Sequence, residues 1–250
     1  MKTRYLLLDE IRGLTLLSMI MYHLVWDLVY LFGTDWEWYS GEAGYLWQQS
    51  ICWTFIFLSG FCWSLGKRKL KRGATIFIGG ILITAVTVFV MPENRVVFGV
   101  LTLLGSCSLL MLPLEKLLKK CPPPIGLTGS IFLFVLFRNV NNGYLGFETW
   151  KLIKLPEGLY QNIVTTYLGF TEAGFFSTDY FSVLPWIFLY IAGYFCYQQM
   201  KGKDRLGVLV RQVLAPLEWL GRHSFEIYLV HQPVIYFVLS LCIGENVNFL

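Results

Sequence analysis

The sequence carries little charge for its length. Only 14% of its 250 residues are charged, whereas about a quarter is usual in a soluble domain. Hydrophobic residues make up 56% and aromatic residues 17%, more apolar sequence than one soluble core of this size can bury. The apolar runs are continuous and do not alternate with polar residues, which argues against an outer-membrane barrel.

Several signatures of known chemistry are also missing. There is no P-loop and no GxGxxG, GxSxG or HExxH pattern. The six cysteines form no CxxC pair and no Cys/His set with the spacing of metal ligands. We therefore expect no disulfide framework, no metal and no nucleic-acid partner, and we find no internal repeat.

What the sequence does contain is a series of seven apolar stretches, each near the ~20 residues that cross a bilayer. They predict an all-α polytopic transmembrane helix bundle, one domain over residues 1–250, in the cell (plasma) membrane. The first stretch contains Asp9 and lacks a cleavage site, so we interpret it as a retained span and not a signal peptide. The predicted spans are 6–31, 47–66, 73–91, 96–115, 125–139, 181–200 and 222–243.

Lysine and arginine are distributed unevenly between the two sides of this predicted bundle. Fourteen fall on the side of the N-terminus and four on the opposite side. The positive-inside rule then places the N-terminus inside and the C-terminus outside. Residues 140–178 become a long outer segment, which is aromatic enough to pack over the bundle, and residues 207–221 suit an interfacial helix.

Ionisable side chains follow one face of the first span. Such residues are rare and usually functional in a membrane helix. Arg12 and His23 are eleven residues apart, close to three helical turns, and Asp27 is within reach of His23 at i+4. A carboxylate can fix the tautomer of an imidazole, whose other nitrogen then takes a proton from a hydroxyl or an amine. We predict His23, Asp27 and Arg12 as catalytic residues; the alternative is a polar pair that joins helices.

Basic residues suggest where an anionic donor binds. Arg12 can hold a phosphate in a bidentate fork, or it can simply pair with Asp9, while Gly13 beside it would allow a neighbouring helix to come close. A basic run after the second span either meets an anionic cofactor or only sets topology and touches anionic lipid. The members of this run that we assign to cofactor binding are Lys67, Arg68, Lys71 and Arg72.

Three further residues are assigned to an acceptor. Asp179 precedes the sixth span and is either a helix cap or an acceptor-binding carboxylate. Trp186 follows Pro185, which should kink that span. His231 lies in the last span before Pro233, where a single histidine also suits helix packing.

Taken in order, several segments resemble the bacterial members of the heparan-alpha-glucosaminide N-acetyltransferase catalytic-domain family, within the membrane acyltransferase superfamily. The resemblance covers essentially the whole chain. The segments are Leu8-Asp9-Glu10-Ile11-Arg12-Gly13-Leu14 with Tyr22-His23 and Asp27-Leu28, Phe57-Leu58-Ser59-Gly60, Lys71-Arg72-Gly73, Phe98-Gly99-Val100-Leu101, Asp179-Tyr180-Phe181 with Leu184-Pro185-Trp186, and Ile227-Tyr228-Leu229-Val230-His231-Gln232-Pro233.

The resemblance implies an enzyme that takes an acetyl group from cytoplasmic acetyl-CoA and delivers it to a sugar across the membrane. It also implies that His23 and Arg12 are the essential residues of the first span. The chain departs from the pattern at Thr102, where many relatives have a histidine. The resemblance does not fix the acceptor as heparan-like.

The leading hypothesis is thus an integral membrane acyltransferase acting on a sugar hydroxyl or amine of a glycan or glycolipid, either directly or through an acetylated histidine. Its partners would be the bilayer and the acceptor, with a homodimer also open. Two rivals use the same polar stripe: a transporter or flippase of a polar or lipid-linked solute, and a non-enzymatic scaffold.

Overall fold

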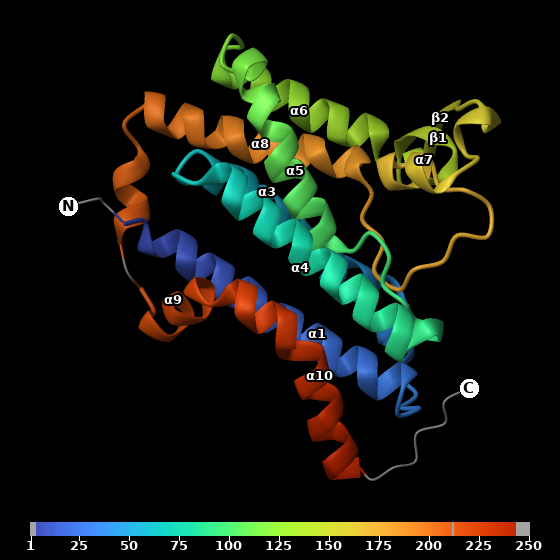
Figure 1. Cartoon of the computed structure of the whole chain (residues 1–250). Helices are drawn as coiled ribbons and strands as arrows, with labels where there is room; N and C mark the ends of the chain where they lie inside the picture. Colours follow the sequence, from blue (N-terminus) through green and yellow to red (C-terminus); the bar gives the residue numbers. More distant parts are fainter. Residues whose placement is uncertain (1–3, 212, 244–250) are drawn as a thin grey trace. The chain divides into compact units, whose positions relative to one another are not determined.

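A computed structural model describes residues 4–211 and 213–243, and most of them are helical (Figure 1). The chain forms two compact units. Unit 1 combines Met1–Phe55 with Arg205–Leu250, and unit 2 is Ile56–Asp204. Helix α3 (Glu42–Trp63) contributes residues to both.

Unit 1 brings the two ends of the sequence together around α1 (Leu6–Tyr30). This helix packs against α9 (Ala215–Arg222) and α10 (Ser224–Ile243). A Cβ on Gly13 would lie 1.9 Å from the carbonyl oxygen of Leu217, so only glycine permits this approach. The predicted role of Gly13 is confirmed. Unit 1 also contains α2 (Glu37–Ser40) and the 3₁₀ helix η4 (Leu206–Val210).

Glu10 fixes the chain that leads into α9. Its side chain is almost fully buried, and its Oε1 accepts hydrogen bonds from the backbone N–H groups of Val213 at 2.7 Å and Leu214 at 2.9 Å. On the opposite side of the same contact, a Cβ on Gly221 would lie 1.8 Å from the carbonyl oxygen of Asp9. Asp9 and Glu10 therefore both take part in the packing of α1 against α9 and the residues just before it. Residues 207–221 were predicted as one interfacial helix; the structure has two short helices there, η4 and α9.

Unit 2 is built from two helix pairs. Helix α4 (Lys69–Val90) packs on α5 (Val100–Leu118), and α6 (Pro123–Phe137) packs on α8 (Val183–Gly202), as Figure 1 shows. As in unit 1, glycines allow neighbouring helices to come close. A Cβ on Gly105 would lie 2.5 Å from the backbone of Phe77, and one on Gly193 would lie 2.1 Å from the carbonyl oxygen of Phe57. Within the first turn of α8, Leu184 has non-helical torsions, where Pro185 was predicted to kink the span.

The segment between α6 and α8 has its own structure. It contains η2 (Val140–Asn142), the antiparallel hairpin of β1 (Tyr144–Phe147) and β2 (Trp150–Lys154), η3 (Glu157–Leu159) and α7 (Ile163–Leu168). Buried Asn139 closes the hairpin, because its Nδ2 donates to the carbonyl oxygens of Glu148 at 2.9 Å and Trp150 at 3.1 Å. Strand β1 packs on α6 and α7 packs on α8. The prediction that this segment is folded over the helices is confirmed.

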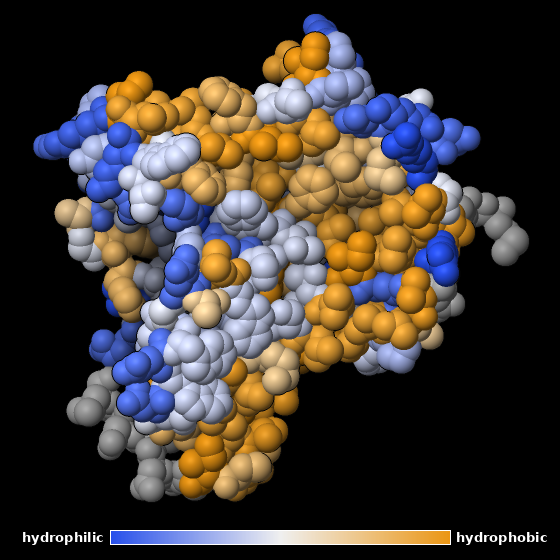
Figure 2. Space-filling view, turned by 180° about the vertical axis from the view of Figure 1, so that it is seen from behind, coloured by the Kyte–Doolittle hydropathy of each residue, from blue (hydrophilic) through white to orange (hydrophobic). Residues whose placement is uncertain are grey.

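Five helical stretches of the described chain are long and apolar enough to cross a membrane. They are α1, α4, α5, the stretch Pro123–Asn142 and α10. Large apolar side chains point outward from them, with Phe89 85% and Leu241 70% exposed, and apolar residues cover wide areas of the face in Figure 2. Such a surface is unfavourable in water and indicates a membrane protein. The other two predicted spans correspond to α3 and α8, so the number seven and the orientation stay predictions.

Candidate active site

Two of the three histidines meet inside unit 1. The ring centroid of His23 on α1 lies 4.8 Å from that of His231 on α10, with the ring planes at 62°. His231 is 8% exposed, and His23 is half-buried beside Tyr22. The sequence placed His23 at the catalytic centre and His231 on the acceptor side. The structure brings both into one site.

The hydrogen bond of His231 defines the chemistry of its ring. Its Nδ1 lies 2.6 Å from the carbonyl oxygen of Tyr228. Because a carbonyl can only accept, Nδ1 must carry a proton. In the neutral ring, Nε2 then holds a lone pair and can accept a proton. A base in this tautomer is suited to general base catalysis.

Asp27 does not orient His23. The carboxylate is fully buried, and its Oδ1 accepts a hydrogen bond from Nε2 of Gln232 at 2.5 Å. Its Oδ2 has no hydrogen-bond partner in the described chain, so the predicted bond between His23 and Asp27 is wrong. The reason is geometric: α10 passes close enough to α1 to place an amide against Asp27. Gln232 thus ties the two histidine-bearing helices together.

Three buried polar atoms at this place have no partner among the described residues. They are Oδ2 of Asp27, Oε1 of Gln232 and Nε2 of His231. All three can accept a hydrogen bond, and buried acceptors are normally satisfied by protein, ordered water or a ligand. These atoms can therefore accept hydrogen bonds from a group that carries O–H or N–H donors, such as a hydroxyl, an amine or a water molecule.

An aromatic cluster lies next to His23 and begins with Tyr22, whose ring centroid is 5.8 Å from that of the imidazole. Tyr22 has its ring 5.3 Å from that of Trp47 and 5.1 Å from that of Tyr39. The Tyr39 hydroxyl donates to the carbonyl oxygen of Tyr22 at 3.1 Å. Burial raises the pKa of Tyr39 far above its usual value, so this phenol remains a neutral donor. These rings form an aromatic cluster around Tyr22, the residue next to His23 on α1.

Arg12 lies on α1 far from the histidines. Eleven residues of helix separate it from His23, a rise of ~16 Å, so the two side chains cannot contact the same atom. Nη1 of Arg12 is 2.8 Å from Oδ1 of Asp9, whose other oxygen is 3.0 Å from Arg4. The pairing with Asp9, one of the two alternatives considered for Arg12, is thus present.

The basic run lies in unit 2, around the start of α4. Its four predicted cofactor ligands, Lys67, Arg68, Lys71 and Arg72, are all exposed. Lys69 in the same run has a structural role instead: its Nζ is 3.2 Å from Glu115 and 3.5 Å from the ring centre of Trp63. Exposed side chains suit either of the two predicted roles, which are contact with an anionic cofactor and setting of the topology with contact to anionic lipid.

Asp179 and Trp186 have packing roles in unit 2. Oδ2 of Asp179 accepts a hydrogen bond from the backbone N–H of Val100 at 3.1 Å, so it caps α5. The predicted cap was for the following helix, and that detail is wrong. Burial raises the pKa of Asp179 to about 6. Trp186 is only 4% exposed and packs on Phe134 and Phe181, which leaves little of its surface for an acceptor.

Thr102, where the sequence departs from the pattern that the resemblance implies, is buried in α5. Its backbone nitrogen would lie 2.5 Å from a Cβ on Gly80, so α4 and α5 touch there. The second imidazole next to His23 in this chain comes from His231. One indirect signal of this role is visible in the sequence: His231 stands beside Gln232, and two adjacent polar residues within an apolar span are unusual.

In residues 4–211 and 213–243, no group of three or more His, Cys, Asp and Glu side chains is arranged to hold a metal ion. The two histidines, one carboxylate and one amide suit proton transfer within a buried polar cluster.

Comparison with known proteins identifies the family. The family model described as heparan-alpha-glucosaminide N-acetyltransferase, catalytic, matches residues 4–233, which include both histidines of the pair. Comparisons with curated proteins and with solved structures gave no match. Because the family model matches most of the chain, this protein belongs to the heparan-alpha-glucosaminide N-acetyltransferase catalytic family, which points to acetyltransferase activity in a membrane.

Proposed function

We propose that the protein transfers an acetyl group from cytoplasmic acetyl-CoA to a sugar hydroxyl or amine of an extracytoplasmic glycan or glycolipid. The observation that carries the proposal is the pair formed by His23 and His231. Nε2 of His231 has no hydrogen-bond partner among the described residues, and two further buried acceptor atoms, on Asp27 and Gln232, also have none there.

The histidine pair supplies the proton transfers that acyl transfer needs. One imidazole takes the proton of the attacking hydroxyl or amine as its oxygen or nitrogen bonds to the acyl carbon. The same proton then goes to the departing sulfur, so charge balances over the reaction. When bound, acetyl-CoA supplies the thioester. The acyl group would reach the acceptor either directly or after transfer to a histidine nitrogen.

Asp27 and Gln232 act as positioning residues. Their 2.5 Å hydrogen bond links α1 to α10 about one helical turn from His23 and next to His231 in the chain. A shift of either helix would separate the two rings, and small misplacements of catalytic groups reduce rates strongly. We expect the loss of this bond to lower turnover more than it alters donor affinity.

Arg12 is the proposed contact in unit 1 for the donor's phosphates. Arg12 lies ~16 Å along α1 from His23, a separation that suits a long donor with its thioester at one end and its phosphates at the other. Its ion pair with Asp9 would be shared with, or exchanged for, a phosphate. The expected place of action is the plasma membrane.

Acetyl transfer in isolated membranes tests the proposal. Membranes containing the protein receive radiolabelled acetyl-CoA, and label in the glycan and glycolipid fractions is measured. His23→Ala and His231→Ala should lower labelling by about 10²-fold or more, while the exposed histidine variant His223→Ala should match the wild type. Undiminished labelling with His23→Ala, in protein that purifies with normal yield and size, would refute it. Solute flux without any acyl donor would favour a transporter.

A further inference from the structure

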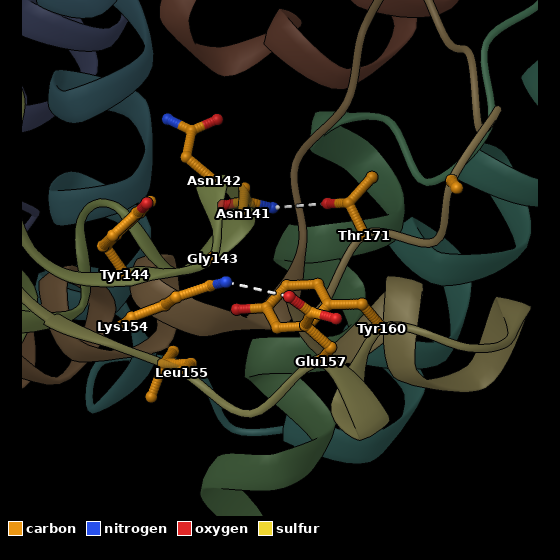
Figure 3. Close-up of a pocket in the computed structure, with 10 residues that line it drawn as sticks. Asn141, Asn142, Gly143, Tyr144, Lys154, Leu155, Glu157, Tyr160 and Thr171 are labelled. Atoms are coloured by element: carbon orange, nitrogen blue, oxygen red, sulfur yellow. Dashed lines mark hydrogen bonds and ion pairs between the residues drawn. The ribbon is translucent and has the colours of Figure 1, made fainter.

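A second site lies in unit 2, in the segment that connects α6 with α8. It is a cavity of about 460 Å³, within the size range of small-ligand pockets. Its walls come from η2, the beginning of β1, the end of β2, η3 and the loop after α7. The lining side chains that Figure 3 labels include Asn141, Asn142, Tyr144, Lys154, Glu157 and Tyr160.

The charges in this pocket cancel. Lys154 and Glu157 are the two charged residues that line it, and the Lys154 Nζ lies 2.8 Å from the Glu157 Oε1 (Figure 3). The other lining groups are amides, hydroxyls, phenols and small apolar side chains. A pocket without net charge has no electrostatic preference for a phosphate, a nucleotide or a polyanionic chain.

The floor of the pocket is held in place by a network of hydrogen bonds. Nδ2 of Asn141 donates to Oγ of Ser182 at 3.0 Å, and it faces Thr171 in Figure 3. The Tyr160 hydroxyl donates to the carbonyl oxygen of Val140 at 2.7 Å, and the Thr171 hydroxyl lies 3.1 Å from that of Tyr180. A preformed floor reduces the ordering that a ligand must induce on binding.

Other groups in the wall remain available to a ligand. The Asn142 side chain is exposed and offers one acceptor and two donors. Tyr144 is partly exposed and presents an aromatic ring; the Nζ of Lys151, which is not one of the residues that line the pocket, lies 4.9 Å from the centre of that ring. Amides match the combined donor and acceptor character of sugar hydroxyls, and an aromatic ring packs against the apolar C–H face of a sugar.

We propose that this pocket binds an uncharged saccharide of about two sugar units and serves as a docking subsite for the acceptor glycan. The docking role rests on the proposed acyltransferase function, whereas the binding of sugar does not. A heparan-like acceptor should bind this pocket poorly, because its sulfate and uronic-acid groups would bring charge into a pocket whose lining has no net charge.

Direct binding to the purified full-length chain tests the inference. The protein is placed in phosphatidylcholine nanodiscs, because alkyl maltoside detergents carry a sugar head group that would compete. Saturation-transfer NMR and calorimetry then measure cellobiose, maltose and N,N′-diacetylchitobiose, with cellobiouronic acid as the charged counterpart. We expect at least one neutral disaccharide to bind with a Kd of about 1 mM or below, and the uronic acid to bind about tenfold more weakly.

Variants locate the binding. Asn142→Ala and Tyr144→Ala should each weaken neutral disaccharide binding by about fivefold to tenfold. Gln161→Ala and Trp150→Ala replace an exposed amide and an exposed aromatic ring of the same segment outside the pocket, so they should bind like the wild type. Circular dichroism and hydrodynamic size check that each variant is folded. His23→Ala, in the other unit, should bind sugar normally.

The outcomes separate this inference from the proposed function. Sugar binding without acetyl transfer would refute the acyltransferase proposal and leave the pocket assignment in place. Acetyl transfer without binding of any of the three neutral disaccharides at 10 mM would overturn the pocket assignment alone. Equal effects in pocket and control variants, or tighter binding of cellobiouronic acid, would also overturn it.

Discussion

Replacing Glu10 gives a sharp test of how unit 1 is held together. One carboxylate oxygen of Glu10, Oε1, accepts hydrogen bonds from the backbone N–H groups of both Val213 and Leu214. A hydrogen bond to a charged group contributes ~1.5–3 kcal/mol net. Because one oxygen serves both donors, we expect Glu10→Ala to lower the free energy of unfolding by about 3 kcal/mol. Glu10→Gln keeps a carbonyl oxygen at that position and should lose only about 1 kcal/mol.

Equilibrium unfolding in mixed SDS micelles measures these differences. Glu37→Ala, which removes an exposed glutamate of α2, serves as the control and should stay within about 0.5 kcal/mol of the wild type. Trypsin provides a local measurement, because Arg211 lies just before the two backbone groups, and cleavage after it should accelerate in Glu10→Ala. The reasoning is refuted if Glu10→Gln is as damaging as Glu10→Ala, or if neither variant differs from the control.

Three further predictions concern packing, capping and the hairpin. Gly221→Ala should lower stability by about 1–3 kcal/mol in chemical unfolding because α9 must move away from α1, whereas Gly129→Ala, which has open space around it, should not; equal effects would contradict the packing argument. Burial raises the Asp179 pKa to about 6 from 3.8, so the folded state prefers the protonated acid, and stability should fall as pH rises through the window from about 4 to 6. Asp179→Asn should abolish that slope in thermal unfolding, and an unchanged slope would exclude Asp179 as its source. Asn139→Ala should lower stability by about 2 kcal/mol and expose the hairpin to proteolysis, because two carbonyl oxygens lose their donor; an unchanged cleavage rate would contradict that role.

Much of the helical plan was predictable from apolar run length. Each of the seven predicted stretches contains a helix, because the backbone must satisfy its own hydrogen bonds wherever lipid replaces water. The role of Gly13 was predictable for a similar reason, since small residues mark close helix contacts. The hairpin after α6 was not predicted. It depends on the buried amide of Asn139 and on Gly146 with φ of +139°, which are tertiary details of a short loop.

The candidate site was predictable in part. His23 and Arg12 stand out as ionisable groups on one helical face, a periodicity that the sequence displays directly. The partner of Asp27 was predicted wrongly, because an i+4 histidine was the only local choice while the actual partner, Gln232, is 205 residues away in the chain. The meeting of His23 with His231 likewise requires α1 to pack on α10. Pairing between distant helices is set by packing, and single-sequence periodicity carries no record of it.

A double-mutant cycle on the histidine pair tests the central claim most directly. Initial rates of acetyl transfer from acetyl-CoA are measured in membranes for the wild type, His23→Ala, His231→Ala and the double variant. If the two imidazoles act as one catalytic unit, each single variant loses about 10²-fold or more and the double variant is scarcely slower than either. A His231→Ala variant with wild-type rate, or losses that multiply in the double variant, would contradict this account.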